Sequence, residues 1–224
     1  MEAHNPKSTK RKKTRSSKTR ARSRMVTAIV IFSVLMILAG IGLFVFLYGG
    51  THQDGVPSYV QKMYLTRNPY SRPAEKLPEV KSIVIHYVAN PQTSAEANRN
   101  YFQNLSNKLS NPSGVKASSH FIVGLEGEVI QCIPLTEIAY ANYPLNYETI
   151  SIEVCHPDAS GEFKPATYDS VIRLTADLLK KYGLTADDVI RHHDVSGKNC
   201  PKFYVEHEDA WEKMKADIAA LLEE

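Results

Sequence analysis

The chain has 224 residues and a formal net charge of +3, which is enough length for one good-sized domain with additional segments. The charge is uneven, because residues 1–25 carry ten Lys or Arg and a single acid, which gives +9 there and −6 over residues 26–224. The net positive charge therefore belongs to the N-terminal tail, and this excludes a uniformly basic folded domain.

An uncharged apolar run follows the tail at residues 26–48. About 20 apolar residues in a helix cross a bilayer, so we predict a transmembrane helix here. The positive-inside rule then predicts a cytoplasmic tail at residues 1–25 and a single-pass cell-membrane protein whose remainder lies outside. A cleaved signal peptide is the alternative, but its apolar core is usually about 7–15 residues long, and Phe-Leu-Tyr-Gly-Gly is a poor cleavage site.

The tail contains a Lys-Arg-Lys-Lys run at residues 10–13, which matches a loose pattern for nucleic-acid binding. Beside a predicted transmembrane helix, a topology signal that contacts anionic lipid is the simpler interpretation. We therefore predict the membrane, and no nucleic acid, as the partner of this end. The sequence gives no indication of an oligomeric state.

Residues 49–79 are punctuated by glycine and proline and are interpreted as a linker that becomes a lead-in to the folded domain at 80–224. Residues 82–87 form a β-branched apolar run that predicts a buried strand. Thr93 and Glu96 have the spacing of a capping box, and apolar residues from Ala97 to Leu109 then predict one face of a helix.

Further along, residues 119–123 and 128–133 predict a strand pair joined by a turn, and residues 149–154 alternate as a strand does, with Ser151 and Glu153 on one side. A helix is predicted at 168–182, with Thr167 as its N-cap, and another from residue 208. A short strand at 189–190 lies between them. These elements predict an α/β fold with a mixed central sheet flanked by helices, preceded by the transmembrane helix.

Three residues in this pattern resemble a zinc site. His86 and His192 each end a predicted strand, and Cys200 follows eight residues after His192 in a loop. Zinc favours histidine nitrogen and cysteine thiolate, and three protein ligands leave a fourth position for water. The spacing alone leaves open that His86 and Cys200 are ordinary core residues, and that His193 takes the place of His192.

Several motifs occur in the order that a known family shows: Ile85-His86-Tyr87 with Asn90-Pro91, Ser118-Ser119-His120-Phe121-Ile122-Val123, Ile150-Ser151-Ile152-Glu153, and Arg191-His192-His193-Asp194-Val195-Ser196-Gly197-Lys198-Asn199-Cys200-Pro201. Over residues 58–224 the chain resembles the type 2 N-acetylmuramoyl-L-alanine amidase family, which includes phage endolysins and animal peptidoglycan-recognition proteins. The resemblance implies hydrolysis, outside the membrane, of the amide bond between N-acetylmuramic acid and L-alanine in peptidoglycan.

Carried over by motif, the family's zinc ligands fall on His86, His192 and Cys200, and its catalytic residues fall on Glu153 and Lys198. The resemblance implies that Glu153 is a general base and that Lys198 stabilises the oxyanion. A solvated strand residue or a partner that orients a zinc-bound histidine is the alternative for Glu153, and a surface lysine is the alternative for Lys198.

The sequence departs from the family at two places. Ser119 stands where some members have a tyrosine, which leaves more of the proton transfer to Glu153. The segment 139–142, Ala-Tyr-Ala-Asn, stands where many members have Trp-His. The substrate contacts that other family members make through this segment therefore do not carry over to this chain.

The other histidines and cysteines receive simpler interpretations. His120 is either structural or faces the cleft, and His156 and His207 are expected at the surface. Cys132 and Cys155 are expected in the core, with a disulfide between them as an alternative.

A non-catalytic peptidoglycan-binding module is the main alternative function, because relatives that lack the cysteine ligand bind the wall without cutting it. A structural zinc domain is a second alternative, although such sites usually use four protein ligands.

Overall fold

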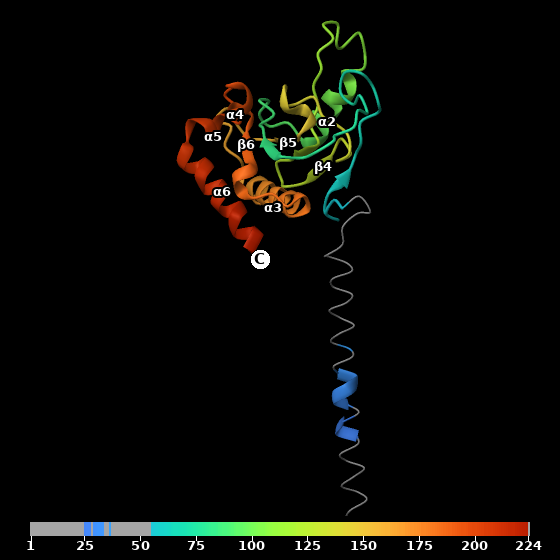
Figure 1. Cartoon of the computed structure of the whole chain (residues 1–224), viewed down its shortest axis with the longest axis vertical. Helices are drawn as coiled ribbons and strands as arrows, with labels where there is room; N and C mark the ends of the chain where they lie inside the picture. The colour runs from blue at the N-terminus through green and yellow to red at the C-terminus, as the bar shows by residue number, and fades with distance from the viewer. Residues whose placement is uncertain (1–24, 28, 34–35, 37–54, 224) are drawn as a thin grey trace, which may run out of the picture. The chain divides into compact units, whose positions relative to one another are not determined.

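The computed structural model describes residues 25–27, 29–33, 36 and 55–223. The chain divides into two compact units, residues 1–50 and residues 51–224, each of which is described by itself. Figure 1 shows the elements of the second unit.

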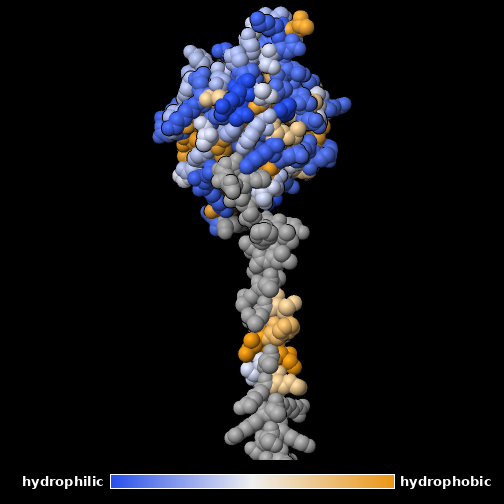
Figure 2. Space-filling model, turned by 90° about the vertical axis from the view of Figure 1, so that its right-hand side faces the viewer, coloured by the Kyte–Doolittle hydropathy of each residue, from blue (hydrophilic) through white to orange (hydrophobic). Residues whose placement is uncertain are grey.

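The described residues of the first unit are helical, and their large apolar side chains are exposed (Figure 2). Within the described ranges, no helix combines the length and the apolar character that a membrane span requires. Most of the transmembrane helix predicted at residues 26–48, and nearly all of the predicted tail at residues 1–25, lie outside the described residues. Both therefore stay predictions.

A six-stranded mixed sheet forms the centre of the second unit, in the order β1-β4-β3-β5-β2-β6. Its strands are β1 Gln61–Lys62, β2 Ser82–Ile85, β3 Phe121–Val123, β4 Val129–Gln131, β5 Thr149–Val154 and β6 Val189–Arg191. The β3–β4 pair is antiparallel, whereas the other neighbours are parallel. The predicted mixed α/β architecture is confirmed, with the β3 and β4 strands shorter than predicted.

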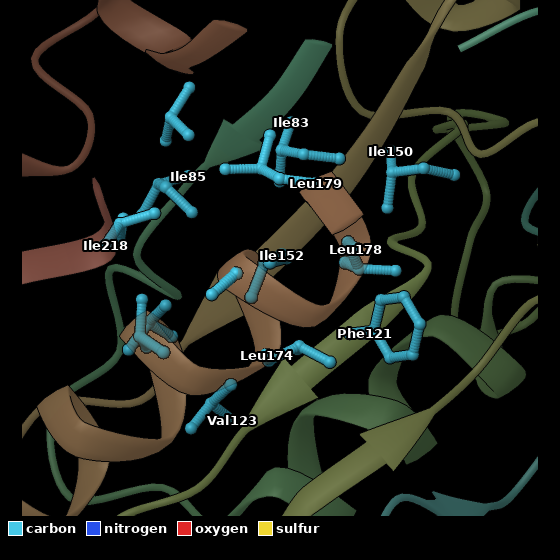
Figure 3. Packing of buried hydrophobic residues seen from close by; sticks show 14 of the residues in the cluster. Ile83, Ile85, Phe121, Val123, Ile150, Ile152, Leu174, Leu178, Leu179 and Ile218 are labelled. Atoms are coloured by element: carbon cyan, nitrogen blue, oxygen red, sulfur yellow. The ribbon is translucent and has the colours of Figure 1, made fainter. Parts of the chain in front are cut away.

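One face of the sheet packs against the helices α3 Pro165–Tyr182 and α6 Glu208–Glu223. Successive strand residues point to opposite faces, so isoleucines at alternate positions of β2 and β5 contact the leucines of α3 (Figure 3). The larger hydrophobic core lies in this layer. Each fully buried leucine or isoleucine side chain contributes about 1.5–3 kcal/mol through its removal from water.

The helix α2 Ala95–Asn104 covers the other face, where Phe102 and Leu105 pack against Ile122 and Ile130. Glu153 points to this side of the sheet, because Ile152 and Val154 point to the α3 side. Short elements complete the unit: the 3₁₀ turns η1 Leu145–Tyr147 and η2 Ala186–Asp188, and the helices α4 His192–Ser196 and α5 Lys202–Glu206.

The lead-in segment is part of the fold from Val56 onward. Val56, Val60 and Leu77 are buried in the larger core, and β1 adds a strand beside β4. Arg72 makes two hydrogen bonds with the carboxylate of Glu137, at 2.7 and 2.9 Å. This ion pair joins the lead-in to the segment that follows the β3–β4 hairpin.

Helix starts differ from the sequence prediction. Ser94, not Thr93, caps α2, since its hydroxyl accepts a hydrogen bond from the backbone N–H of Ala97. The helix ends at Asn104, so Leu109 lies beyond it and is exposed. The helix α3 starts at Pro165, which places Thr167 inside the helix, where its hydroxyl donates to the carbonyl of Gly124.

Candidate zinc site

The three predicted ligands come together at one edge of the sheet. His86 directly follows β2, and His192 directly follows β6, the strand beside it. Both strands are parallel, so their carboxyl ends lie at the same edge, which is where open α/β sheets commonly bind ligands. Cys200 reaches this edge from the loop after α4, which is closed by a hydrogen bond from the His193 N–H to the Cys200 carbonyl.

Ligand atoms of His86, His192 and Cys200 all lie within 4.8 Å of one another. The distance from His86 Nδ1 to Cys200 Sγ is 3.8 Å. Zn–N and Zn–S bonds of ordinary length at a tetrahedral angle would separate these atoms by about 3.6 Å. Two histidine nitrogens and one cysteine sulfur are also the donor set that zinc prefers. The residues therefore fit a zinc ion with three protein ligands.

Glu153, predicted as the general base, lies beside this cluster. Its Oε1 is 3.9 Å from His86 Nδ1, and its Oε2 is buried without a hydrogen-bond partner among the described residues. Burial raises the pKa of this carboxyl to about 8. A buried carboxyl oxygen without a partner is costly, and groups of this kind are typical of sites that have a catalytic role or bind an ion or water.

The two histidines present uncharged rings to the site. Burial, with the nearby His192 as a second cause, lowers the pKa of His86 to about 3. The pKa of His192 is also lowered, by burial first and then by the charge of Lys198. A neutral imidazole has the lone pair that a metal ligand requires, so this environment favours metal binding over protonation.

Burial raises the pKa of the Cys200 thiol to about 12, and the Glu153 carboxylate adds to the rise. The backbone N–H of Tyr87 and the charge of Lys198 act in the opposite direction, because each stabilises the thiolate. A bound metal deprotonates a coordinating thiol outright. The surroundings of Cys200 therefore suit a thiolate that is held by a metal and hydrogen-bonded to Tyr87.

His193, the rival of His192, is directed elsewhere, since its Nδ1 is 2.9 Å from the carbonyl oxygen of Lys198. His120 is structural: its Nδ1 accepts from the Ser151 N–H, and its Nε2 is 3.0 Å from the Glu137 carbonyl.

The surface position predicted for His156 is wrong. This residue is 1% exposed: its ring packs against that of Tyr87, with 5.1 Å between the ring centroids, and its Nδ1 is 2.7 Å from the Asp158 carbonyl oxygen. Cys132 and Cys155 are buried and unpaired, as expected for core residues.

The cluster lies in a groove of about 850 Å³. Tyr140 and Tyr143 line one wall, together with Lys116, whose ammonium lies 5.2 Å from the Tyr140 ring centroid. Lys198, the predicted oxyanion-stabilising residue, also lines the groove. Among the described residues of this lining, Glu153 is the one acid, so the accessible part of the groove is positively charged.

One residue at this site was missed by the sequence analysis. The side-chain oxygen of Asn142 lies 2.6 Å from His86 Nε2, and both residues are buried. The two positions are 56 residues apart, and Asn142 belongs to the segment where the family motif does not apply. Neither spacing nor resemblance could therefore have identified it.

Residues 76–203 match the N-acetylmuramoyl-L-alanine amidase family. The chain is 33% identical over 178 residues to the N-acetylmuramoyl-L-alanine amidase BlyA of Bacillus subtilis (strain 168), with 70% of this chain and 46% of the relative covered. It is 31% identical over 175 residues to the amidase CwlL of Bacillus licheniformis, with 73% and 47% covered. The matches thus span about half the length of these relatives.

Solved structures share the fold. The catalytic domain of XlyA superposes with a TM-score of 0.58 at 25% identity, over 71% of this chain and 98% of that domain. A mutant endolysin from Bacillus subtilis gives the same TM-score at 26% identity, over 71% and 97%. The family match covers more than half of the described folded unit and includes all three clustered ligands and Glu153. The chain therefore belongs to the N-acetylmuramoyl-L-alanine amidase family.

Proposed function

We propose that this chain is a zinc-dependent N-acetylmuramoyl-L-alanine amidase, which hydrolyses the amide between N-acetylmuramic acid and L-alanine in peptidoglycan. The observation that carries the proposal is the gathering of His86, His192 and Cys200 within 4.8 Å, beside a buried oxygen of Glu153 that has no hydrogen-bond partner in the described part of the chain. The relatives that match this chain are named as amidases for the same bond.

Zinc is the metal that this donor set favours. When bound by His86, His192 and Cys200, it supplies Lewis acidity toward the amide carbonyl and toward water. The chain's own residues must then move protons, stabilise charge and hold the substrate.

Glu153 accepts the proton of the attacking water in this proposal, which is supported by its position beside the metal cluster and by an oxygen with no hydrogen-bond partner among the described residues. The same carboxyl can return this proton to the leaving amine nitrogen as the carbon–nitrogen bond breaks. Burial raises the pKa of Glu153 to about 8 in the metal-free protein, and the positive charge of a zinc ion bound beside it would favour the ionised carboxylate that accepts a proton.

Lys198 lies on the loop between His192 and Cys200 and lines the groove. Its positive charge lowers the pKa values of both His192 and Cys200, so the positive potential of Lys198 acts on the metal-ligand cluster. A cation there stabilises the negative charge that develops on the carbonyl oxygen during attack.

The charge of the groove also suits the proposed substrate. Stem peptides carry carboxylates, and the accessible lining offers Lys116 and Lys198 as cations. The aromatic rings of Tyr140 and Tyr143 give flat surfaces against which a sugar or peptide can pack.

The two alternative functions predict different sites. A binding module does not need a complete ligand set, whereas Cys200 is present and lies at the cluster. A structural zinc domain would surround the ion with four protein ligands, whereas the potential ligand group among the described residues has three members, His86, His192 and Cys200. Both observations favour the enzyme.

We further propose that residues 26–48 anchor the enzyme in the cell membrane, with residues 1–25 cytoplasmic and the amidase domain outside. The exposed apolar side chains of the described helical residues support this, because such a surface is stable in lipid and costly in water. An anchor would restrict hydrolysis to peptidoglycan near the membrane.

A zymogram with purified cell wall tests the enzyme proposal. The wild type should clear the wall, a chelator should abolish clearing, and added zinc should restore it. Cys200→Ala should bind wall without clearing it, and His193→Ala serves as the matched control that retains activity. Wall binding without clearing by the zinc-loaded wild type would favour the binding module.

A further inference from the structure

Asn142 contacts His86 on the side away from the metal cluster. Its Oδ1 lies 2.6 Å from His86 Nε2, while His86 Nδ1 faces Cys200 Sγ at 3.8 Å and Glu153 Oε1 at 3.9 Å. Both Asn142 and His86 are 2% exposed, so water does not compete for this bond. The two ring nitrogens of His86 therefore have separate surroundings.

Two hydrogen bonds of the Thr149 hydroxyl determine the direction of the bond between Asn142 and His86. Thr149 Oγ1 lies 2.8 Å from the carbonyl oxygen of Leu145, which can only accept, so the hydroxyl donates there. The same hydroxyl then accepts from Asn142 Nδ2, also at 2.8 Å. The amide nitrogen of Asn142 is thus used toward Thr149, and its oxygen faces His86.

An amide oxygen accepts a hydrogen bond, so His86 Nε2 carries the proton and Nδ1 carries the lone pair. We infer that Asn142 is a positioning residue that fixes the tautomer and the ring orientation of His86, with Thr149 fixing the orientation of the Asn142 amide. The inference rests on the proposed zinc site, since a fixed Nδ1 lone pair serves a metal there. Partners of this kind commonly tune metal ligands.

Hydrogen bonds to the Asn146 side chain also fix the backbone around Asn142. Asn146 accepts hydrogen bonds from the backbone N–H groups of Ala141 and Asn142, at 3.2 and 2.7 Å. The Asn142 side chain therefore reaches His86 from a hydrogen-bonded turn, which consists of η1 and the residues before it. A fixed partner loses little conformational entropy when the site binds a metal.

Four variants of the full chain, purified in detergent, separate this role from a merely structural one. Asn142→Leu removes the acceptor, Asn142→Asp keeps an acceptor oxygen, and Thr149→Val keeps the shape while removing the hydroxyl. Asn111→Leu is the control, because Asn111 is also a buried asparagine, and its three hydrogen bonds hold the 105–115 loop instead.

Zinc affinity is measured by competition with a chelator, and the thermal midpoint of each zinc-free variant is measured beside it. Asn142→Leu should weaken zinc binding by about 10–100-fold, and Thr149→Val by a smaller factor. Asn142→Asp should bind zinc within a few-fold of the wild type. Asn111→Leu should lose thermal stability without losing zinc affinity.

Nitrogen-15 NMR of the zinc-free protein reads the tautomer directly, with the His86 signals assigned by their loss in His86→Gln. The wild type should show a protonated Nε2, and Thr149→Val should show a mixture of the two tautomers. Wild-type zinc affinity in Asn142→Leu, or a protonated Nδ1 in the wild type, would overturn the inference. A wild type that binds no zinc would refute the proposed function instead, while the NMR result would still decide the tautomer.

Discussion

The chemistry of this molecule depends at the residue scale on side chains that are buried beside one another with few polar partners. Two neutral histidines, one thiol and one carboxyl share the end of the sheet, and burial is the largest cause of the pKa shift of each. Such clustering of shifted groups in a groove is typical of active sites.

Glu153 gives a pH-dependent prediction for the zinc-free protein. Its pKa is raised from 4.5 to about 8 on folding, so the folded state binds the extra proton between these values, and stability falls as pH rises through that window. Glu153→Gln removes this contribution. Its free energy of unfolding, relative to wild type, should therefore increase between pH 4.5 and pH 8 and stay level outside that window.

Urea unfolding at a series of pH values measures this difference. His86, whose lowered pKa has the opposite effect, is present in both proteins and cancels in the comparison. Parallel stability curves would show that Glu153 is solvated in the folded state.

Lys198 and Lys116 form a matched pair for kinetics, since both line the groove and each carries one positive charge. Lys198→Met should lower kcat by about 10²-fold with little change in KM, because it removes charge stabilisation from the transition state. Lys116→Met should mainly raise KM, because its ammonium lies at the Tyr140 wall. Steady-state rates on soluble muropeptides distinguish them, and equal effects would contradict the assigned roles.

The family resemblance predicted the clustered residues, whereas spacing alone left open core roles for His86 and Cys200 and the choice between His192 and His193. Residues that are defined by three-dimensional contacts were misplaced or missed. His156 was predicted at the surface, although the ring of Tyr87 covers it. Asn142 escaped notice, because no local pattern links it to His86.

At the element scale, three parallel strands in the order β5-β2-β6 place Glu153, His86 and His192 at one edge. Five of the six strands were predictable from apolar or alternating runs, whereas β1 Gln61–Lys62 lies in the segment that was interpreted as a linker and lead-in. The ends of helices were harder to predict. Thr93 and Ser94 are both good capping residues, and only the folded chain shows that Ser94 caps α2.

The lead-in segment gives a stability prediction with a matched control. Arg72 and Glu137 are 12% and 11% exposed and share two hydrogen bonds, whereas Arg67 is 72% exposed and contacts the same carboxylate at 3.6 Å. Arg72→Met should destabilise the fold by about 3 kcal/mol, since it leaves Glu137 poorly paired. Arg67→Met should cost less than about 1 kcal/mol.

Chemical unfolding at pH 7 measures both values. A small effect of Arg72→Met would show that the lead-in does not depend on this ion pair for its attachment.

At the scale of the whole molecule, the division between residues 1–50 and 51–224 separates the proposed anchor from the proposed catalyst. A chain that lacks residues 1–48 should hydrolyse purified wall at the wild-type rate, because the groove and its core lie beyond the deletion. In cell fractionation it should leave the membrane fraction. Unchanged membrane association would contradict the anchor, and lost activity would show that the amidase unit needs the N-terminal residues.

The most direct test of the account is to identify the bond that the zinc-loaded protein breaks. Mass spectrometry of digested peptidoglycan should detect free stem peptides that begin with L-alanine, together with glycan strands whose muramic acid carries a free lactyl carboxylate. Products cut within the glycan or within the peptide, with that amide intact, would contradict it.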